Sequence, residues 1–128
     1  TNEDQPSASF EISDEFITRF VKSKDALNDL LSFTVETGEG MTGDELIFTI
    51  GSDITNTIQF KVDERHTINE EFKQIPFDSD LFKEILKSNR SYESGMVHIN
   101  KKGLIQLQFN YNDGFNTNYY LVRLQENN

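Results

Sequence analysis

Residues 13–22, SDEFITRFVK, are followed 65 positions later by a stretch of the same pattern, residues 78–87, DSDLFKEILK. Each stretch opens with a residue type that caps helix N-termini and continues with acids, which suit the positive end of a helix dipole. The apolar residues of both fall at i, i+1, i+4 and i+5, which is one face of an α-helix. The constant offset predicts two amphipathic helices in an internally duplicated chain.

Elsewhere the apolar residues alternate with polar ones, the period of a half-buried β-strand. A short apolar stretch precedes each helix, at 10–12 and 72–77, and Pro76 places the second of these at a sheet edge or strand end. Asp113-Gly114 has the composition of a tight hairpin turn. Three alternating runs follow each helix, and their expected core residues are Leu31, Phe33, Val35; Leu46, Phe48, Ile50; Ile58, Phe60, Val62; Val97, Ile99; Ile105, Leu107, Phe109, Tyr111; and Tyr120, Val122, Leu124.

The pattern therefore predicts the order βαβββ twice, an α+β fold, with an acidic connection at 63–71. We expect a polar tail at 1–8 and one domain at 9–128, with pseudo-repeats at 9–63 and 72–125. Antiparallel sheets with one apolar face need a cover. We therefore expect both helices to pack on the same side of the sheets.

Composition removes several classes of function. The 128 residues include no cysteine, so disulfide scaffolds, thiolate zinc sites and thiol nucleophiles are excluded. No apolar run approaches the length of a membrane span, about 18 residues, and no N-terminal segment has the pattern of a signal peptide. We expect a soluble protein of the cytoplasm, which would be the host cytoplasm for a viral protein.

The motifs that could indicate catalysis or metal binding are weak. The glycines of 38–43 match the letters of a dinucleotide fingerprint, but a strand rather than a helix follows and nearby acids would repel phosphate. His66 and His98 have no second histidine at metal-ligand spacing, so both are expected to be ordinary surface residues. The chain contains no Gly-x-Ser-x-Gly nucleophile motif. We expect no enzyme activity, no catalytic residue, no metal and no cofactor.

The basic residues are unevenly distributed in a chain of net charge −10. Six of the twelve fall in or at the end of the two helices, and the acids are expected to crowd the loops and tails. On a helix whose apolar face packs on a sheet, such bases face outward and can contact nucleic-acid phosphates without reading bases. Free association would be weak at this net charge, so encirclement of DNA would explain the combination better than affinity. The six candidates are Arg19, Lys22, Lys24, Lys83, Lys87 and Arg90.

With these residues the chain resembles the DNA sliding clamps, the processivity factors of replicative polymerases. Residues 10–26 are similar to the start of the C-terminal domain of tailed-phage clamps, and Tyr119-Tyr120-Leu121 resembles the final strand of cellular clamps. The resemblance implies helices that line a ring around duplex DNA, sheets on the outside, and backbone contacts by the six bases. It also implies a partner-peptide pocket at Tyr120, Leu121 and Val122, with residues 4–8 as the end of an interdomain connector.

The partners that this resemblance implies are duplex DNA, a replicative polymerase, a clamp loader and further copies of the domain or subunit in a ring. Two other interpretations stay open. One is a β-sheet module that binds a peptide or ligand and has no DNA role, in which case the two basic stripes would diverge in space. The other is a small hydrolase, which would need a cleft that gathers a histidine with a carboxylate.

Overall fold

The computed structural model describes residues 5–38, 44–51 and 56–125. Neither helix in this part of the chain is long and apolar enough to cross a membrane. The elements run in the order β1 (Ala8–Glu11), α1 (Asp14–Ala26), β2 (Ser32–Gly38), β3 (Glu45–Gly51), β4 (Thr57–Lys61), β5 (His66–Ile68), β6 (Ile75–Asp78), α2 (Ser79–Ser88), β7 (Ser94–Asn100), β8 (Leu104–Asn110) and β9 (Asn116–Val122).

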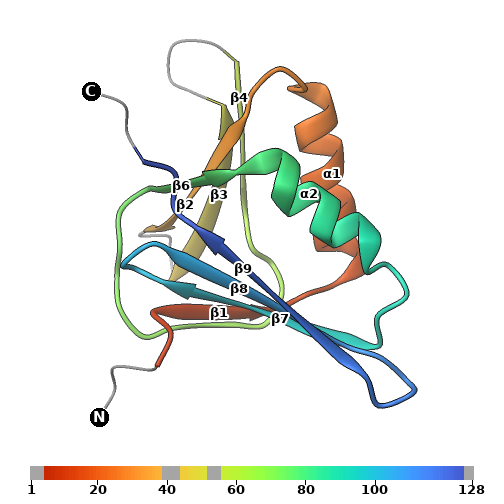
Figure 1. Cartoon of the computed structure of the whole chain (residues 1–128). Helices are drawn as coiled ribbons and strands as arrows, with labels where there is room; N and C mark the ends of the chain where they lie inside the picture. The colour runs from red at the N-terminus through yellow and green to blue at the C-terminus, as the bar shows by residue number, and fades with distance from the viewer. Residues whose placement is uncertain (1–4, 39–43, 52–55, 126–128) are drawn as a thin grey trace.

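The strands form two antiparallel sheets, and both helices lie together on one side of them (Figure 1). One sheet has five strands in the order β5-β1-β7-β8-β9, and the other has four in the order β4-β3-β2-β6. The prediction of an α+β fold with two helices on one side of antiparallel sheets is confirmed. Pro76 lies in β6, an edge strand, where its missing N–H is tolerated.

The strand that leads into each helix pairs with the sheet built by the other half of the chain. β1 pairs with β7, with Ala8 opposite Ile99, and β6 pairs with β2, with Phe77 opposite Phe33. The two halves therefore complete each other's sheets.

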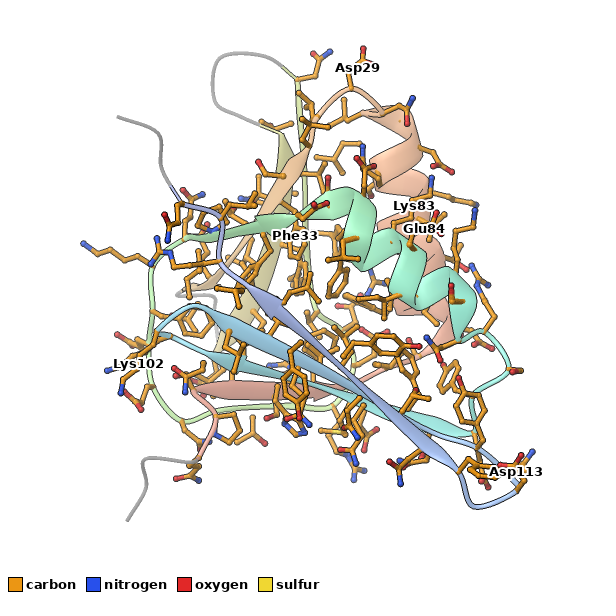
Figure 2. The ribbon with its side chains drawn as sticks, in the orientation of Figure 1. Asp29, Phe33, Lys83, Glu84, Lys102 and Asp113 are labelled. Carbon is orange, nitrogen blue, oxygen red and sulfur yellow. The ribbon has the colours of Figure 1, made fainter. Side chains whose placement is uncertain are left out.

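The core lies between the helices and the sheets and is rich in phenylalanine. Phe16 and Phe20 of α1 and Phe82 of α2 are fully buried against Phe33 and Phe48 of the four-stranded sheet. Neighbouring ring centroids in this group lie 4.7 to 6.4 Å apart. Figure 2 shows Phe33 between its strand and the helices.

Both helices begin where the sequence pattern predicts. Ser13 Oγ accepts a hydrogen bond from the Phe16 amide at 2.9 Å, and Asp78 Oδ1 accepts one from the Leu81 amide at 2.9 Å. These bonds satisfy amides that a helix start leaves without a partner. Leu81 departs from its predicted place on the apolar face, because it is exposed in the first turn of α2.

The end of α2 is tied to the five-stranded sheet through a buried asparagine. Asn89, the C-cap, donates from Nδ2 to the Ile85 carbonyl at 2.8 Å and to the Tyr119 hydroxyl at 3.1 Å. Its Oδ1 accepts from the Tyr111 hydroxyl and from Thr117 Oγ1. One side chain thus connects the helix with β9 and with the residue that follows β8.

Four residues that the alternation of the strands predicts for the core are exposed. Tyr120, Val122 and Leu124 are exposed, and it is Tyr119 and Leu121 that face the core. The consecutive pairs Tyr-Tyr and Leu-Val fit either phase of a strand, and pairing with β8 selects the observed one, with Leu121 opposite Ile105. Leu31 lies before β2 and is exposed.

The chain also has a strand within the acidic connection that alternation did not reveal. This strand, β5, pairs with β1. It has only three residues, which are too few to show the alternation of a strand in the sequence. Ala8, assigned to the polar tail, begins β1 and is buried, because β7 covers it on one side and β5 on the other. Asp4, at the start of the expected connector, lies outside the described residues.

The predicted turn at Asp113-Gly114 is confirmed. Gly114 has φ +87°, a conformation that favours glycine, and its amide donates to the Tyr111 carbonyl at 3.0 Å. Residues 39–43, most of the glycine-rich stretch, lie outside the described residues, but β2 and β3 pair antiparallel on either side of them. The flanking elements are therefore two strands, and not the strand and helix of a dinucleotide site.

Candidate nucleic-acid interface

The two helices form a layer joined by ion pairs. α1 and α2 contact each other, and two lysine–aspartate pairs cross between them, Lys83–Asp25 and Lys24–Asp80. Figure 2 labels Lys83 and Glu84 on the part of α2 next to α1. The two helices that carry the predicted bases are therefore neighbours.

Three of the six predicted bases are exposed on this layer. They are Lys22 of α1, Lys87 of α2 and Arg90, two residues beyond the end of α2. Within the described residues, none of the three makes an ion pair at 4.0 Å or less. These side chains are available for contact with an anionic partner.

Lys83 is on the same layer but is already engaged. Its Nζ lies 2.5 Å from Asp25 Oδ1, and only 18% of the Lys83 side chain is exposed. The hydrogen bond to Lys83 lowers the pKa of the Asp25 carboxyl, and the same bond raises the pKa of the Lys83 amine. Any phosphate that binds Lys83 has to compete with this carboxylate.

Lys24, predicted to bind DNA, cannot do so from the surface. Its side chain is 0% exposed, and its Nζ donates to the Asn28 carbonyl at 2.7 Å and lies 3.1 Å from Asp80 Oδ1. The reason is helical periodicity: Lys24 follows Phe16 and Phe20 at intervals of four residues, so it lies on the apolar face. The aliphatic stem is buried there while the amine reaches polar partners at the helix end.

Arg19 is directed toward the acidic connection. Its guanidinium lies 3.0 Å from Glu64 and 3.7 Å from Asp63, and it covers the ring of Phe60 at 5.2 Å. Ser13 Oγ also donates to Glu64. Arg19 therefore fixes the connection after β4 to the flank of α1, and its charge is largely balanced inside the protein.

The helical layer is close to neutral, although it holds half of the basic residues of the chain. From Asp14 to Ala26 and from Ser79 to Arg90 the sequence has six basic and five acidic residues. The acids are Asp14, Glu15, Asp25, Asp80 and Glu84. The net charge of these segments is +1 in a chain of −10, so the rest of the chain carries −11.

A second candidate surface lies on the outer face of the five-stranded sheet. His98 of β7 lies opposite Gln106 of β8, and Gln106 lies opposite Tyr120 of β9. Leu104 of β8 lies opposite Val122 of β9. Tyr120 is 60% exposed and Val122 is 71% exposed, so two of the three predicted pocket residues face solvent. Leu121 does not belong to this surface, because the alternation of the strand directs it into the core.

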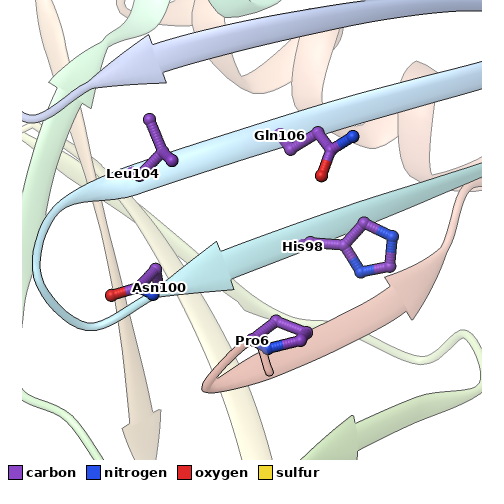
Figure 3. A pocket seen from close by; sticks show the side chains of 5 residues that line it. All are labelled: Pro6, His98, Asn100, Leu104 and Gln106. Carbon is purple, nitrogen blue, oxygen red and sulfur yellow. The ribbon is translucent and has the colours of Figure 1, made fainter. Parts of the chain in front are cut away.

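A hollow of about 300 Å³ adjoins this surface, lined by Pro6, His98, Asn100, Leu104 and Gln106 (Figure 3). Sequence reasoning missed these residues. The alternation of β8 places Leu104 and Gln106 on the outer face, but only the register shows which residues of β7 and β9 accompany them.

The two histidines are partly buried and bonded within the protein. His66 Nδ1 lies 2.8 Å from the Glu64 carbonyl and Nε2 lies 3.0 Å from the Asp44 carbonyl, and these bonds raise the pKa of His66. His98 Nδ1 lies 2.7 Å from Ser9 Oγ, and burial lowers the pKa of His98. Across the described residues, no cluster of three histidine or carboxylate side chains could hold a metal ion.

Comparison with known structures identifies the architecture. Proliferating cellular nuclear antigen from Entamoeba histolytica superposes with a TM-score of 0.70 over 96% of the chain, at 15% sequence identity. The beta subunit of DNA polymerase from Streptococcus pyogenes superposes with a TM-score of 0.60 over 95% of the chain, at 12% identity.

The chain has the DNA clamp fold. It spans 48% of the length of the Entamoeba protein and 32% of the Streptococcus protein. No protein-family model and no curated protein matches the sequence. The clamp fold is therefore recognised from the three-dimensional structure, and the sequence shares only 15% and 12% identity with the two structural neighbours.

Proposed function

We propose that the chain is a domain of a sliding clamp, a processivity factor that encircles duplex DNA and tethers a replicative polymerase to it. The observation that carries the proposal is the match of 96% of the chain to the clamp fold, with both helices in one layer. The resemblance to tailed-phage clamps and to a C-terminal domain is part of this proposal. Further copies of the domain, in the same or in other chains, would complete the ring.

Lys22, Lys87 and Arg90 would contact the DNA. Their side chains are exposed on the helical layer and can bind phosphates as charges, which gives no preference for base sequence. With only three such bases in a strongly acidic chain, we expect weak and salt-sensitive contact. Enclosure within the ring, rather than affinity, would keep the protein on DNA.

Tyr120 and Val122 would contact an apolar peptide of the polymerase or the clamp loader. They stand on β9 beside Leu104, which lines the neighbouring hollow. An exposed aromatic and two exposed aliphatic residues on one sheet face are typical of an interaction site. This surface lies on the sheets, so a bound polymerase would not compete with DNA for the helices.

The test of DNA contact is processive primer extension on circular DNA with the polymerase and loader of the same source. The double variant Lys22→Glu/Lys87→Glu should shorten the products synthesised in one binding event. The matched control is Lys73→Glu/Lys102→Glu, which changes the net charge equally at exposed sites outside the helices. Figure 2 shows Lys102 on the side of the molecule away from the helices.

Equal processivity of the helix variant and the wild type would refute the DNA role. In the same assay Tyr120→Ala should abolish stimulation of the polymerase while the protein stays folded by circular dichroism. If Tyr120→Ala alone has an effect and the helix variant has none, the peptide-binding module without a DNA role becomes the better description.

A further inference from the structure

Asp25 stands at a place where helix stability does not favour an acid. It is exposed in the last turn of α1, where the carbonyl ends of the helix carry partial negative charge. Lysine or arginine is the stabilising choice at such a position. The helix of Asp25 therefore gives no stabilising reason for an aspartate at this position.

The surroundings of Asp25 are strongly basic. Lys83 of the neighbouring helix donates to its carboxylate at 2.5 Å, and the charges of Lys83, Lys87 and Lys24 all stabilise the ionised form. The carboxylate is 55% exposed, so it lies at the surface of the helical layer rather than beneath it. An anion bound to this layer at Lys83 would occupy the same place.

We propose that Asp25 acts as an internal substitute for a DNA phosphate, which occupies Lys83 and lowers the affinity of the helical layer for DNA. This inference rests on the proposed function and adds a residue that sets the strength of DNA contact. Lys24, the other lysine in a cross-helix pair, is buried, so Lys83 is the base whose availability Asp25 controls.

Low affinity for DNA is an advantage in a protein that slides along it. Every phosphate contact has to be broken before the ring can advance, so each added contact raises the barrier to sliding. A ring that encloses DNA needs no affinity to remain attached. The carboxylate of Asp25 neutralises the charge of Lys83, so a phosphate can bind this lysine only by displacing the carboxylate.

The experiment measures the affinity of the full chain for a fluorescent duplex DNA as a function of salt concentration. Releasing one lysine adds about 0.9 to the slope of log affinity against log salt. We therefore expect Asp25→Asn to bind about fifteenfold more tightly at about 50 mM salt and about fivefold more tightly at about 150 mM. Asp25→Glu keeps the competing charge and should bind like the wild type.

The controls separate this local effect from net charge and from folding. Asp113→Asn makes the same chemical change at the tip of the β8–β9 hairpin, away from the helices in Figure 2, and should leave the affinity within twofold of the wild type. Lys83→Met should lower the affinity in the wild type, because it leaves the Asp25 carboxylate unpaired, and should remove the whole gain in the Asp25→Asn background. Circular dichroism of each variant verifies its fold.

The remaining outcomes distinguish the two proposals. If Lys87→Met weakens binding but Asp25→Asn does not strengthen it, the role of Asp25 is refuted and the DNA role stands. An equal gain from Asp113→Asn also refutes it, because net charge would then account for the effect. If neither the wild type nor Asp25→Asn binds DNA at the lowest salt concentration, the inference is refuted, while the proposed function is decided separately by the processivity assay.

Discussion

Replacing Phe48 by alanine is the sharpest test of how the core is built. Phe48 lies in β3, an interior strand of the four-stranded sheet, and is fully buried. Its ring stacks on Phe33 at 5.5 Å and 11° and on Phe60 at 5.7 Å and 8°. The rings of Phe10 and Phe16 meet it edge-on at 5.8 and 5.3 Å.

The expected loss is about 4 kcal/mol in the free energy of unfolding. Truncation of a buried phenylalanine costs about 3 to 5 kcal/mol, depending on how far the cavity can collapse. Here the surrounding rings belong to β1, α1, β2 and β4, and β3 is held by strands on both sides, so collapse is restricted. A total stability of about 5 to 15 kcal/mol would leave a folded but weakened protein.

The assay is urea unfolding followed by circular dichroism, with Phe115→Ala as the control. Phe115 is exposed on the β8–β9 hairpin, so its truncation should change the free energy by no more than about 0.5 kcal/mol. A loss below about 2 kcal/mol at Phe48 with an unchanged urea dependence would refute the reasoning, because it would mean that the phenylalanine cluster rearranges freely.

Three further changes have defined outcomes. Asn89→Ala leaves two tyrosine hydroxyls without their partner and should lower the free energy of unfolding by about 2 kcal/mol in the same urea assay. The pKa of His66 is raised above 6.5, so the stabilising effect of the charged ring is complete below pH 6.5 and is lost as the pH rises through the raised value. His66→Gln should therefore destabilise the protein more at pH 5.5 than at pH 8.5, measured by thermal unfolding. A destabilisation that does not change with pH would contradict this prediction. Lys24→Met should leave the affinity for duplex DNA unchanged in a fluorescence titration, whereas Lys87→Met should lower it, and equal losses would show that Lys24 reaches the surface.

The helices and most strands were predictable because their burial follows a simple period. Phe33, Phe48 and Leu107 face the core as the alternation indicates. The last strand was not predictable in phase, since Tyr119-Tyr120-Leu121-Val122 offers an apolar residue to either face. Its orientation is decided by pairing with β8, a contact between segments that the period of one strand does not encode.

The sequence predicts which basic residues the helices carry, but not which of them are already paired with acids of the same protein. The spacing of Lys22 and Lys87 correctly places them on exposed faces. The engagement of Lys83 with Asp25 depends on how the two helices pack, and these residues are 58 positions apart. The burial of Lys24 could have been found, because its spacing from Phe20 puts it on the apolar face; only its polar partners needed the structure.

The strand before each helix pairs with a strand from the other half of the chain, β1 with β7 and β6 with β2. This pairing imposes an order of assembly on a newly made chain. All four strands of the four-stranded sheet have been synthesised by residue 78, so that sheet can close around α1 while the rest is still being translated. β1 has to wait for β7, whose pairing joins Ala8 to Ile99. At about 5 to 20 residues per second that wait lasts about 5 to 20 s, during which the edge of β1 that later pairs with β7 has no strand beside it. The five-stranded sheet, which carries the outer interaction surface, is therefore the last part of the molecule to form.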